Sequence, residues 1–544
     1  MRRWWTRFYT SDYIVILAIV LLGLVMRFYY AWQPLPILID QGMSDDAFYY
    51  LNIARNVVLG KGVSFDGITP TNGFHPLYLG MLIPLFLIFP TAGVPERVLA
   101  HNLELNAQLG LSILMLFNAA SAFPLYALLK HSISQAAGFV GVVIWLFNPW
   151  VLVIALAGVE TAPYIFFVAL VSFLYIKYRA EYHSRVLLKK LFTLGLLCGL
   201  TVLARSDGIF LLIAILLDIL LNKNKAWQIT IPLAACGIIL APWLLWNYLT
   251  FGTLTQVSGL AVFQHTHFGV NSSWGKMITT LIQSTGRMLV VSSILIYQSF
   301  FLLALVLIMR VLPRYRRKSE RLDKTGSLRF LYFYAFLIFG FYAWYLLRKQ
   351  FWYFMPLIFV ISVFSGVMHE AFIHYVKNGN HTQMNIFTGF VAGVLLVTFG
   401  IGWWVWQSRD YVVYPTEQNG YILAQWIRQE TATEARIGSW NSGILGYLSR
   451  RTVINLDGVV NNDLYRYVVE KRISFYDLAG MWDYIESMDI NYITDYENIL
   501  SPAIMPLADE ASLERRLELV YQFPSVHNKG EYPVRVYRVL KTSQ

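Results

Sequence analysis

The stretch Tyr13–Trp32, YIVILAIVLLGLVMRFYYAW, decides the fold class of this 544-residue chain. As a helix it is about 30 Å long, which matches the hydrocarbon thickness of a bilayer. Arg2, Arg3 and Arg7 precede it, and the stretch has neither the shorter apolar region nor the small-residue cleavage site of a signal peptide. We therefore expect a retained first membrane span whose N-terminal end is cytoplasmic.

The composition of the whole chain agrees with that expectation. Hydrophobic residues make up 57% of it and charged residues only 14%, against about 25% in an ordinary soluble domain. This excludes a soluble enzyme, a coiled coil and a disordered protein. The net charge of +11 does not indicate nucleic acid, because the basic residues lie between apolar runs. Cys198 and Cys236 lie inside such runs and support neither a disulfide framework nor a zinc site.

Ten further apolar runs are long enough to be candidate spans. They are Leu105–Leu129, Ala136–Ala157, Ala162–Tyr178, Leu191–Ala204, Gly208–Leu221, Trp227–Tyr248, Met288–Met309, Phe330–Leu347, Phe351–Met368 and Ile386–Trp406. The shorter run Pro76–Pro90 is left out, since counting it would move the strongly basic loop Arg310–Lys324 outside, and basic loops stay inside. Its length and its flanking prolines favour an interfacial or re-entrant helix. We predict a multi-pass protein of the cell membrane with about eleven spans.

The chain changes character after residue 406. Residues 407–544 hold 14 of the 43 Lys and Arg but 18 of the 32 Asp and Glu, so they form a mildly acidic region. Helical segments alternate there with short β-branched runs, which predicts a soluble α/β domain. The expected helices are Gly420–Gln429 and Gly443–Leu448, and the expected strands are Ala435–Trp440, Thr452–Leu456, Asn491–Thr494 and Val534–Val539. We expect two domains, 1–406 in the membrane and 407–544 extracytoplasmic.

Polar residues gather in the first outer loop, 33–80. Asp45 and Asp46 follow Ser44, a good N-cap, at the start of a helix with an apolar face. They either serve chemistry or only complement the helix dipole. Lys61 lies between two glycines, and His75 precedes Pro76 in the segment TNGFHP. Taken by itself, His75 favours a structural role.

Other ionisable residues lie at turns predicted to face the same side. Glu160 stands between the third and fourth spans, where a carboxylate is costly and is either functional or a helix-start residue. Arg205 and Asp207 lie between two short apolar runs, so their turn should be recessed and line a cavity, or else hold an internal ion pair. Arg348 and Lys349 are candidate phosphate ligands or interfacial snorkelling residues.

Carboxylates and cations at the rim of a membrane cavity suggest that the two kinds of residue have different roles. Cations hold an anionic, lipid-borne group such as a phosphate, and a carboxylate takes the proton of an acceptor hydroxyl. No nucleotide-phosphate loop is present, since the glycines around Lys61 lack the Ser or Thr of that motif. A phosphorylated donor would therefore come from the membrane.

Several of these motifs together resemble the GT-C membrane glycosyltransferases. The likeness covers nearly the whole chain and is nearest to the bacterial family 39-like, protein-mannosyltransferase and aminoarabinose-transferase group, with some similarity to mycobacterial arabinosyltransferases. The segments that carry it are Asp45-Asp46-Ala47-Phe48, Thr71–Leu77, Gly158–Thr161, Pro242-Trp243, Asn247-Tyr248, Phe251-Gly252, Trp426–Arg428, Ala435–Gly438, Gly443–Tyr447 and Asn455–Gly458.

The resemblance implies a GT-C fold and an enzyme that moves a sugar, with inversion, from a polyprenyl-phosphate donor to a glycan, lipid or protein acceptor. Asp45 or Asp46 would be the general base, and Glu160 the second acidic position. The implied substrate-binding residues are Lys61, His75, Arg205, Asp207, Arg348, Lys349 and Tyr353. No cofactor is certain and metal dependence stays open, because oligosaccharyltransferase-like members need a metal whereas others need none.

Two other functions fit the apolar spans. A transporter or flippase of lipid-linked envelope precursors would use the recessed Arg–Asp turn, but it predicts internal repeats, and no repeat stands out. A non-catalytic scaffold would bind envelope partners through its C-terminal domain and would leave Asp45, Asp46 and Glu160 dispensable.

Overall fold

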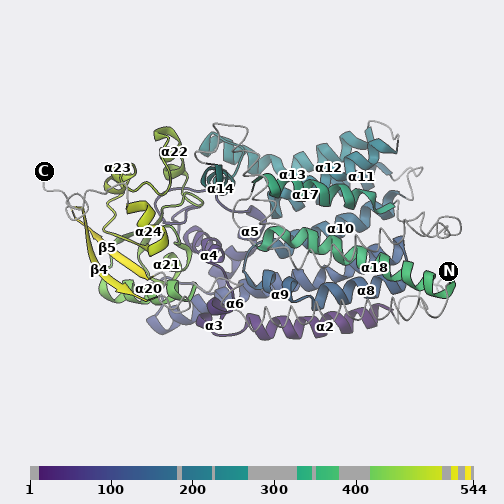
Figure 1. Cartoon of the computed structure of the whole chain (residues 1–544), viewed down its shortest axis with the longest axis horizontal. Helices are drawn as coiled ribbons and strands as arrows, with labels where there is room; N and C mark the ends of the chain where they lie inside the picture. The colour runs from purple at the N-terminus through teal and green to yellow at the C-terminus, as the bar shows by residue number, and fades with distance from the viewer. Residues whose placement is uncertain are drawn as a thin grey trace.

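The computed structural model describes residues 12–179, 187–222, 227–267, 327–345, 351–378, 417–504, 516–524 and 533–540. A helical bundle takes up most of the molecule's length, and an α/β domain covers the end that holds the C-terminus (Figure 1). The helices before residue 400 are α2 (Asp12–Ala31), α3 (Leu35–Asp40), α4 (Asp45–Val58), α5 (Pro76–Ile88), α6 (Glu96–Ala120), α7 (Ala122–Ser132), α8 (Gln135–Phe147), α9 (Pro149–Leu156), α10 (Thr161–Arg179), α11 (Leu187–Ala204), η1 (Ser206–Gly208), α12 (Ile209–Leu221), α13 (Trp227–Phe251), α14 (Val257–His267), α17 (Arg329–Tyr345), η3 (Phe351–Phe354) and α18 (Met355–Asn378).

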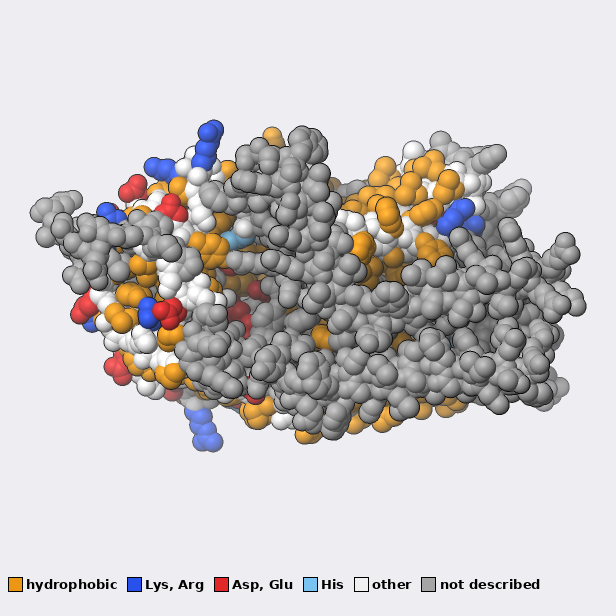
Figure 2. Space-filling model, viewed as in Figure 1, with side chains coloured by type: hydrophobic (Ala, Val, Ile, Leu, Met, Phe, Trp, Pro, Cys, Tyr) orange, Lys and Arg blue, Asp and Glu red, His pale blue; other side chains and the backbone are white. Residues whose placement is uncertain are grey.

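Within the described ranges, six helices are long and apolar enough to cross a membrane. They are Asp12–Ala31, Glu96–Ser132, Thr161–Arg179, Leu187–Ala204, Gln228–Phe251 and Trp352–Glu370. The pair α8 and α9, which meet at 50°, makes a seventh if it counts as one broken span. Two predicted spans, Met288–Met309 and Ile386–Trp406, lie outside the described residues, so the number eleven stays a prediction. Hydrophobic side chains dominate the described surface of the bundle, whereas charged ones gather on the C-terminal domain (Figure 2).

Two shorter apolar helices belong to the bundle. The ambiguous run beginning at Pro76 forms α5, whose 13 residues give about 20 Å of helix, less than the hydrocarbon thickness. Helix α12 also has 13 residues, and the turn before it is buried, with Arg205 and Asp207 only 4% and 7% exposed.

Helix α4 differs in two respects from the serine-capped helix with one apolar face that its sequence predicts. The hydroxyl of Ser44 donates to the carbonyl of Ala157, 2.8 Å away, and does not cap the helix. Phe48 and Ile53 are as buried as the predicted apolar face, because the C-terminal domain covers the other side of the helix. The helix is therefore enclosed between the bundle and the domain.

The C-terminal domain is built on a five-stranded sheet of order β2-β1-β3-β5-β4. Strands β2, β1 and β3 are parallel and β5 and β4 are antiparallel to their neighbours. The predicted helices and strands are present within a few residues, whereas α22, α23, α24 and β4 were not expected. The elements are α20 (Glu417–Glu430), β1 (Arg436–Ser439), α21 (Gly443–Leu448), β2 (Thr452–Asn455), α22 (Asn462–Lys471), α23 (Trp482–Ser487), β3 (Tyr492–Tyr496), α24 (Glu497–Ile504), β4 (Leu517–Phe523) and β5 (Val534–Val539).

The contact between α4 and α21 joins the two parts of the molecule. The carboxylate of Asp45 accepts hydrogen bonds from the backbone N–H groups of Gly443 and Ile444, at 2.9 and 2.7 Å. The N-terminus of a helix attracts a negative charge, so the contact is electrostatic as well as directional. A Cβ atom on Gly443 would lie 2.1 Å from the backbone oxygen of Asp45, so only glycine allows this approach.

We predict that Gly443→Ala destabilises the protein, because its Cβ atom would force α21 away from α4. Overpacking of this kind costs about 1–3 kcal/mol. The measurement is the Tm of the purified full-length protein in detergent, together with the rate at which trypsin removes the C-terminal domain. Gly80→Ala is the control, since nothing lies within 4 Å of a Cβ atom there. An unchanged Tm and an unchanged cleavage rate in Gly443→Ala would contradict the tight contact.

Candidate active site

A cavity of about 530 Å³ lies where one end of the bundle meets α14 and the C-terminal domain. Acidic side chains are visible in a hollow between these parts (Figure 2). Segments far apart in the sequence line the cavity, namely residues 46–50, 73–75, 159–160, 205–210, 255–265, 341–342, 352–353 and 457–459. The predicted carboxylates Asp46 and Glu160 and the predicted cation Arg205 are therefore brought to one place.

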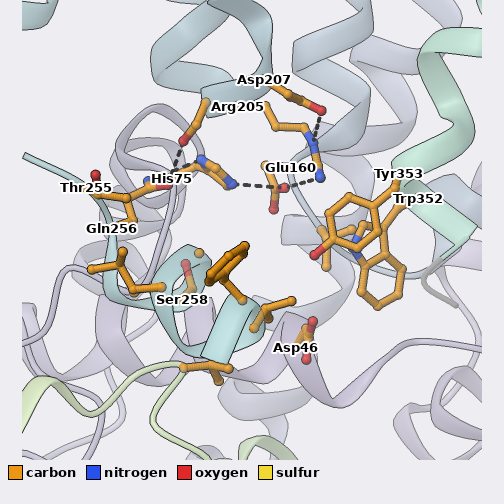
Figure 3. Close-up of a pocket in the computed structure, with 18 of the residues that line it drawn as sticks. Asp46, His75, Glu160, Arg205, Asp207, Thr255, Gln256, Ser258, Trp352 and Tyr353 are labelled. Carbon is orange, nitrogen blue, oxygen red and sulfur yellow. Dashed lines mark hydrogen bonds and ion pairs between the residues drawn. The ribbon is translucent and has the colours of Figure 1, made fainter. Parts of the chain in front are cut away.

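Arg205 is the most heavily bonded side chain of the cavity. Its Nη1 lies 2.7 Å from Oε1 of Glu160, and its Nε lies 3.1 Å from Oδ2 of Asp207. Its Nη2 donates to the hydroxyl of Tyr342 at 3.1 Å, and the ring of Tyr353 lies 4.6 Å from the guanidinium carbon. The internal Arg205–Asp207 ion pair of the alternative interpretation is present, and the pair also lines the cavity (Figure 3).

Glu160 is buried and held by three donors. Besides Arg205, the hydroxyl of Tyr50 donates to its Oε2 at 2.7 Å, and Nε2 of His75 lies 3.4 Å from its Oε1. Burial by itself would raise the pKa of this carboxyl, but His75, Arg205 and Tyr50 outweigh it and lower the pKa. Glu160 is therefore ionised at neutral pH.

Asp46 lies apart from this ion-paired group, on the wall nearer the C-terminal domain (Figure 3). In the described part of the chain, no hydrogen bond or ion pair joins its carboxylate to another group. Burial, together with the negative charges of Asp45, Asp457 and Glu160, raises its pKa to about 8. A carboxyl whose pKa lies near neutrality is suited to accept a proton from a substrate.

Asp45 does not line the cavity, although it adjoins Asp46 in sequence. Both of its oxygens are occupied by the α21 backbone, and the side chain is 6% exposed. Burial raises its pKa to about 6, even though the hydrogen bonds from Ile444 and Gly443 lower it. The geometry thus separates two carboxylates that the sequence left equivalent.

The remaining predicted residues are distributed as follows. His75, Asp207 and Tyr353 line the cavity. Lys61 is exposed and does not line it, and its side chain lies over Gly67. Arg348 and Lys349 lie outside the described residues.

Many of the cavity residues were not expected from the sequence, and four of them show where such residues come from. Gln256 precedes α14, Tyr342 lies in α17, Trp352 lies in η3, and Asp457 belongs to the C-terminal domain. For Asp457 the motif Asn455–Gly458 was a usable signal. No pattern in the sequence predicts that Gln256 or Tyr342 lies in the cavity, since their partners are far away along the chain.

The side chain of Asn72 holds the cavity wall together. Its oxygen accepts from the backbone N–H of Val257 and from the amide of Asn462, both at 2.9 Å. Its nitrogen donates to Asn247 at 3.2 Å and to the carbonyl of Thr255 at 3.3 Å. The segment TNGFHP thereby connects α13, α14 and the C-terminal domain to one another.

Among the described residues, no group of three or more His, Cys, Asp or Glu could hold a metal ion.

The fold is similar to that of solved membrane glycosyltransferases, which agrees with the GT-C fold that the sequence resemblance implies. The apo oligosaccharyltransferase of Archaeoglobus fulgidus matches with a TM-score of 0.51 and 11% identity, over 99% of this chain and 75% of that chain. ArnT from Cupriavidus metallidurans, bound to undecaprenyl phosphate, matches with a TM-score of 0.53 and 12% identity, over 97% of this chain and 98% of that chain. At such identities the likeness establishes the architecture.

Sequence comparison adds one match. A family model described as a domain of unknown function (DUF8728) matches residues 407–537, which correspond to the C-terminal domain. No curated protein matches the chain.

We predict that Arg205→Met lowers stability by about 3–5 kcal/mol, because it leaves Glu160 and Asp207 buried without their positive partner. Thermal unfolding in detergent, followed by tryptophan fluorescence, measures the change. Adding Glu160→Gln should restore part of the loss, since it removes one unpaired charge. The control is Arg538→Met, which breaks an exposed pair with Glu518 and should cost about 0–1 kcal/mol. Equal losses in Arg205→Met and Arg538→Met would contradict the buried cluster.

Proposed function

We propose that the chain is an integral-membrane glycosyltransferase. It moves a sugar, with inversion, from a polyprenyl-phosphate donor to an acceptor hydroxyl on the extracytoplasmic face. The observation that carries the proposal is one cavity in which an unpaired carboxylate, Asp46, stands apart from a buried guanidinium, Arg205. The GT-C architecture supports it, because one matching structure, ArnT, is bound to undecaprenyl phosphate.

The donor phosphate binds at the Arg205 end of the cavity. A guanidinium presents several N–H groups in a plane and is well suited to phosphate oxygens. Ile209, Phe210, Phe341 and Trp352 line the cavity near Arg205 and supply apolar surface for the lipid chain. Glu160 acts through Arg205, which it holds by charge, and through His75, whose Nε2 faces its carboxylate.

Asp46 is the general base. The acceptor hydroxyl gives its proton to the Asp46 carboxylate while its oxygen forms a bond to the anomeric carbon of the sugar. The bond from that carbon to the phosphate oxygen breaks, and the polyprenyl phosphate leaves with the electron pair. Arg205 stabilises the charge that develops on the leaving phosphate. A single displacement of this kind inverts the configuration at the anomeric carbon.

The proposal includes the arrangement in the membrane. With eleven spans and a cytoplasmic N-terminus, the basic loop Arg310–Lys324 lies inside and residues 407–544 lie outside. The cavity then opens on the extracytoplasmic side, where the C-terminal domain forms part of its wall. The acceptor reaches Asp46 from that side.

We predict that Asp46→Asn reduces transfer at least about a hundredfold, the low end of the range for loss of a general base. Membranes or purified protein are offered a panel of radiolabelled polyprenyl-phosphate sugars and acceptor fractions, and the labelled product is counted. Asp45→Asn is the matched control, since it makes the same chemical change one residue away at a group that does not line the cavity. It should lower the Tm more than Asp46→Asn and retain more transfer. Equal transfer by wild type and both variants would refute the assignment.

We predict that kcat/KM rises with pH through about 8, because the base form of Asp46 is its deprotonated form and its pKa is about 8. Below that pH the rate should change about tenfold per pH unit, and above it the rate should level off. In Asp457→Asn the inflection should move to lower pH, since one of the charges that raise the Asp46 pKa is gone. Assays of initial rate between pH 5.5 and about pH 9.5 measure both curves. A profile that falls with rising pH would exclude Asp46 as the base.

A further inference from the structure

Gln256 connects three segments at the wall of the cavity, although no motif in the sequence marks it. Its Oε1 accepts from the hydroxyl of Ser206 at 2.6 Å. Its Nε2 donates to the backbone carbonyl of Phe74 and lies 3.2 Å from Nδ1 of His75 (Figure 3). The side chain is buried, so each of these groups has little water to replace its partner.

The orientation of the Gln256 amide follows from its partners. The carbonyl oxygen of Phe74 only accepts, so the amide group that faces it is the NH2 group. That group has a second hydrogen, and the atom within its reach is Nδ1 of His75. Nδ1 therefore accepts a hydrogen bond and carries no proton.

The position of the proton on His75 is then determined. A neutral imidazole has one N–H, and since Nδ1 is the acceptor, the proton is on Nε2. Nε2 faces Oε1 of Glu160 at 3.4 Å, where an N–H is attracted by the carboxylate. The other tautomer would set two donors against each other at Gln256 and a lone pair against a carboxylate at Glu160.

We propose that Gln256 is a positioning residue that fixes neutral His75 in its Nε2–H tautomer and keeps that N–H directed into the cavity. The contact to Glu160 is long, so the same N–H can bond to a phosphate oxygen of the donor without a change in its position. That last role rests on the proposed transferase function, whereas the tautomer does not.

The charged groups around His75 shift the pKa of its imidazole in both directions. Burial lowers the pKa of the imidazole, the negative charges of Glu160 and Asp207 raise it, and Arg205 lowers it, with a net lowering. The hydroxyl of Tyr50 also contacts this residue, but it accepts from the backbone N–H. Protonation at Nδ1 would place a new N–H against the Gln256 NH2 group. Gln256 therefore opposes the charged form, and a glutamate in its place would favour it.

The experiment uses full-length protein with ¹⁵N-labelled histidine in lipid nanodiscs. The His75 signals are identified by their absence in His75→Asn. In wild type we expect a protonated Nε2 and a bare Nδ1 at neutral pH. In Gln256→Glu the titration of His75 should move upward by about one pH unit or more, since a carboxylate replaces an opposing donor. Gln522→Glu, the same change at an exposed position in β4, should leave the His75 titration unchanged.

A protonated Nδ1 in wild type overturns the proposal, and so does an unchanged His75 titration in Gln256→Glu. The wild-type spectrum needs no substitution, so it decides the tautomer even where a variant folds poorly.

The transfer assay is interpreted separately from the spectrum. If wild type transfers no sugar from any donor, the transferase function fails and the spectrum still tests Gln256. If wild type transfers, Gln256→Leu should raise the KM for the lipid-phosphate donor about tenfold, the size of one lost charged hydrogen bond, with a smaller change in kcat. An unchanged KM in a folded Gln256→Leu protein overturns the role toward the donor.

Discussion

The guanidinium of Arg205 is the group on which the rest of the site depends. A buried positive charge is tolerated only when it is paired and hydrogen-bonded. Glu160 precedes α10, Asp207 lies in η1 and Tyr342 lies in α17, and each bonds to a different nitrogen of Arg205. One side chain thus sets the relative position of three helices. The same bonds hold Glu160 in its ionised form, which in turn orients His75.

The two adjacent carboxylates of α4 show how packing assigns roles that residue type does not. Successive residues of a helix point about 100° apart, so Asp45 and Asp46 cannot face the same neighbour. The C-terminal domain determines what each of the two carboxylates faces. Its helix α21 covers the side of Asp45 and supplies two N–H groups, whereas Asp46 is left facing the cavity. The place of Asp46 in the cavity wall is therefore coupled to a docking contact at position 45.

Much of the fold could be predicted because it depends on local patterns. Apolar runs of about 20 residues mark spans, and the helix Gly443–Leu448 and the strand Val534–Val539 were predicted with the bounds that the structure has. The site was predicted where a motif or a costly residue marks it, as Asp46 and His75 do in the first loop and as Glu160 and Arg205 do between apolar runs. The sequence does not mark Gln256 or Tyr342 in this way, because a glutamine or a tyrosine can stand at many positions without a large energetic cost. Their roles arise from contacts between residues 50 or more positions apart, which no spacing rule encodes.

The domain that the sequence separates by composition forms part of the cavity wall. Asp457 and Val459 line the cavity, and the amide of Asn462 reaches Asn72 on the membrane side. The pKa of Asp46 depends on burial and on the charges of Asp45, Asp457 and Glu160, and of these the docked domain supplies Asp457 and part of the burial. Undocking would admit water and take Asp457 away, and both changes would lower the pKa of Asp46. The pKa of Asp46 is therefore set in part by the contact between the two domains, and a change in docking alters that pKa before any cavity residue is replaced.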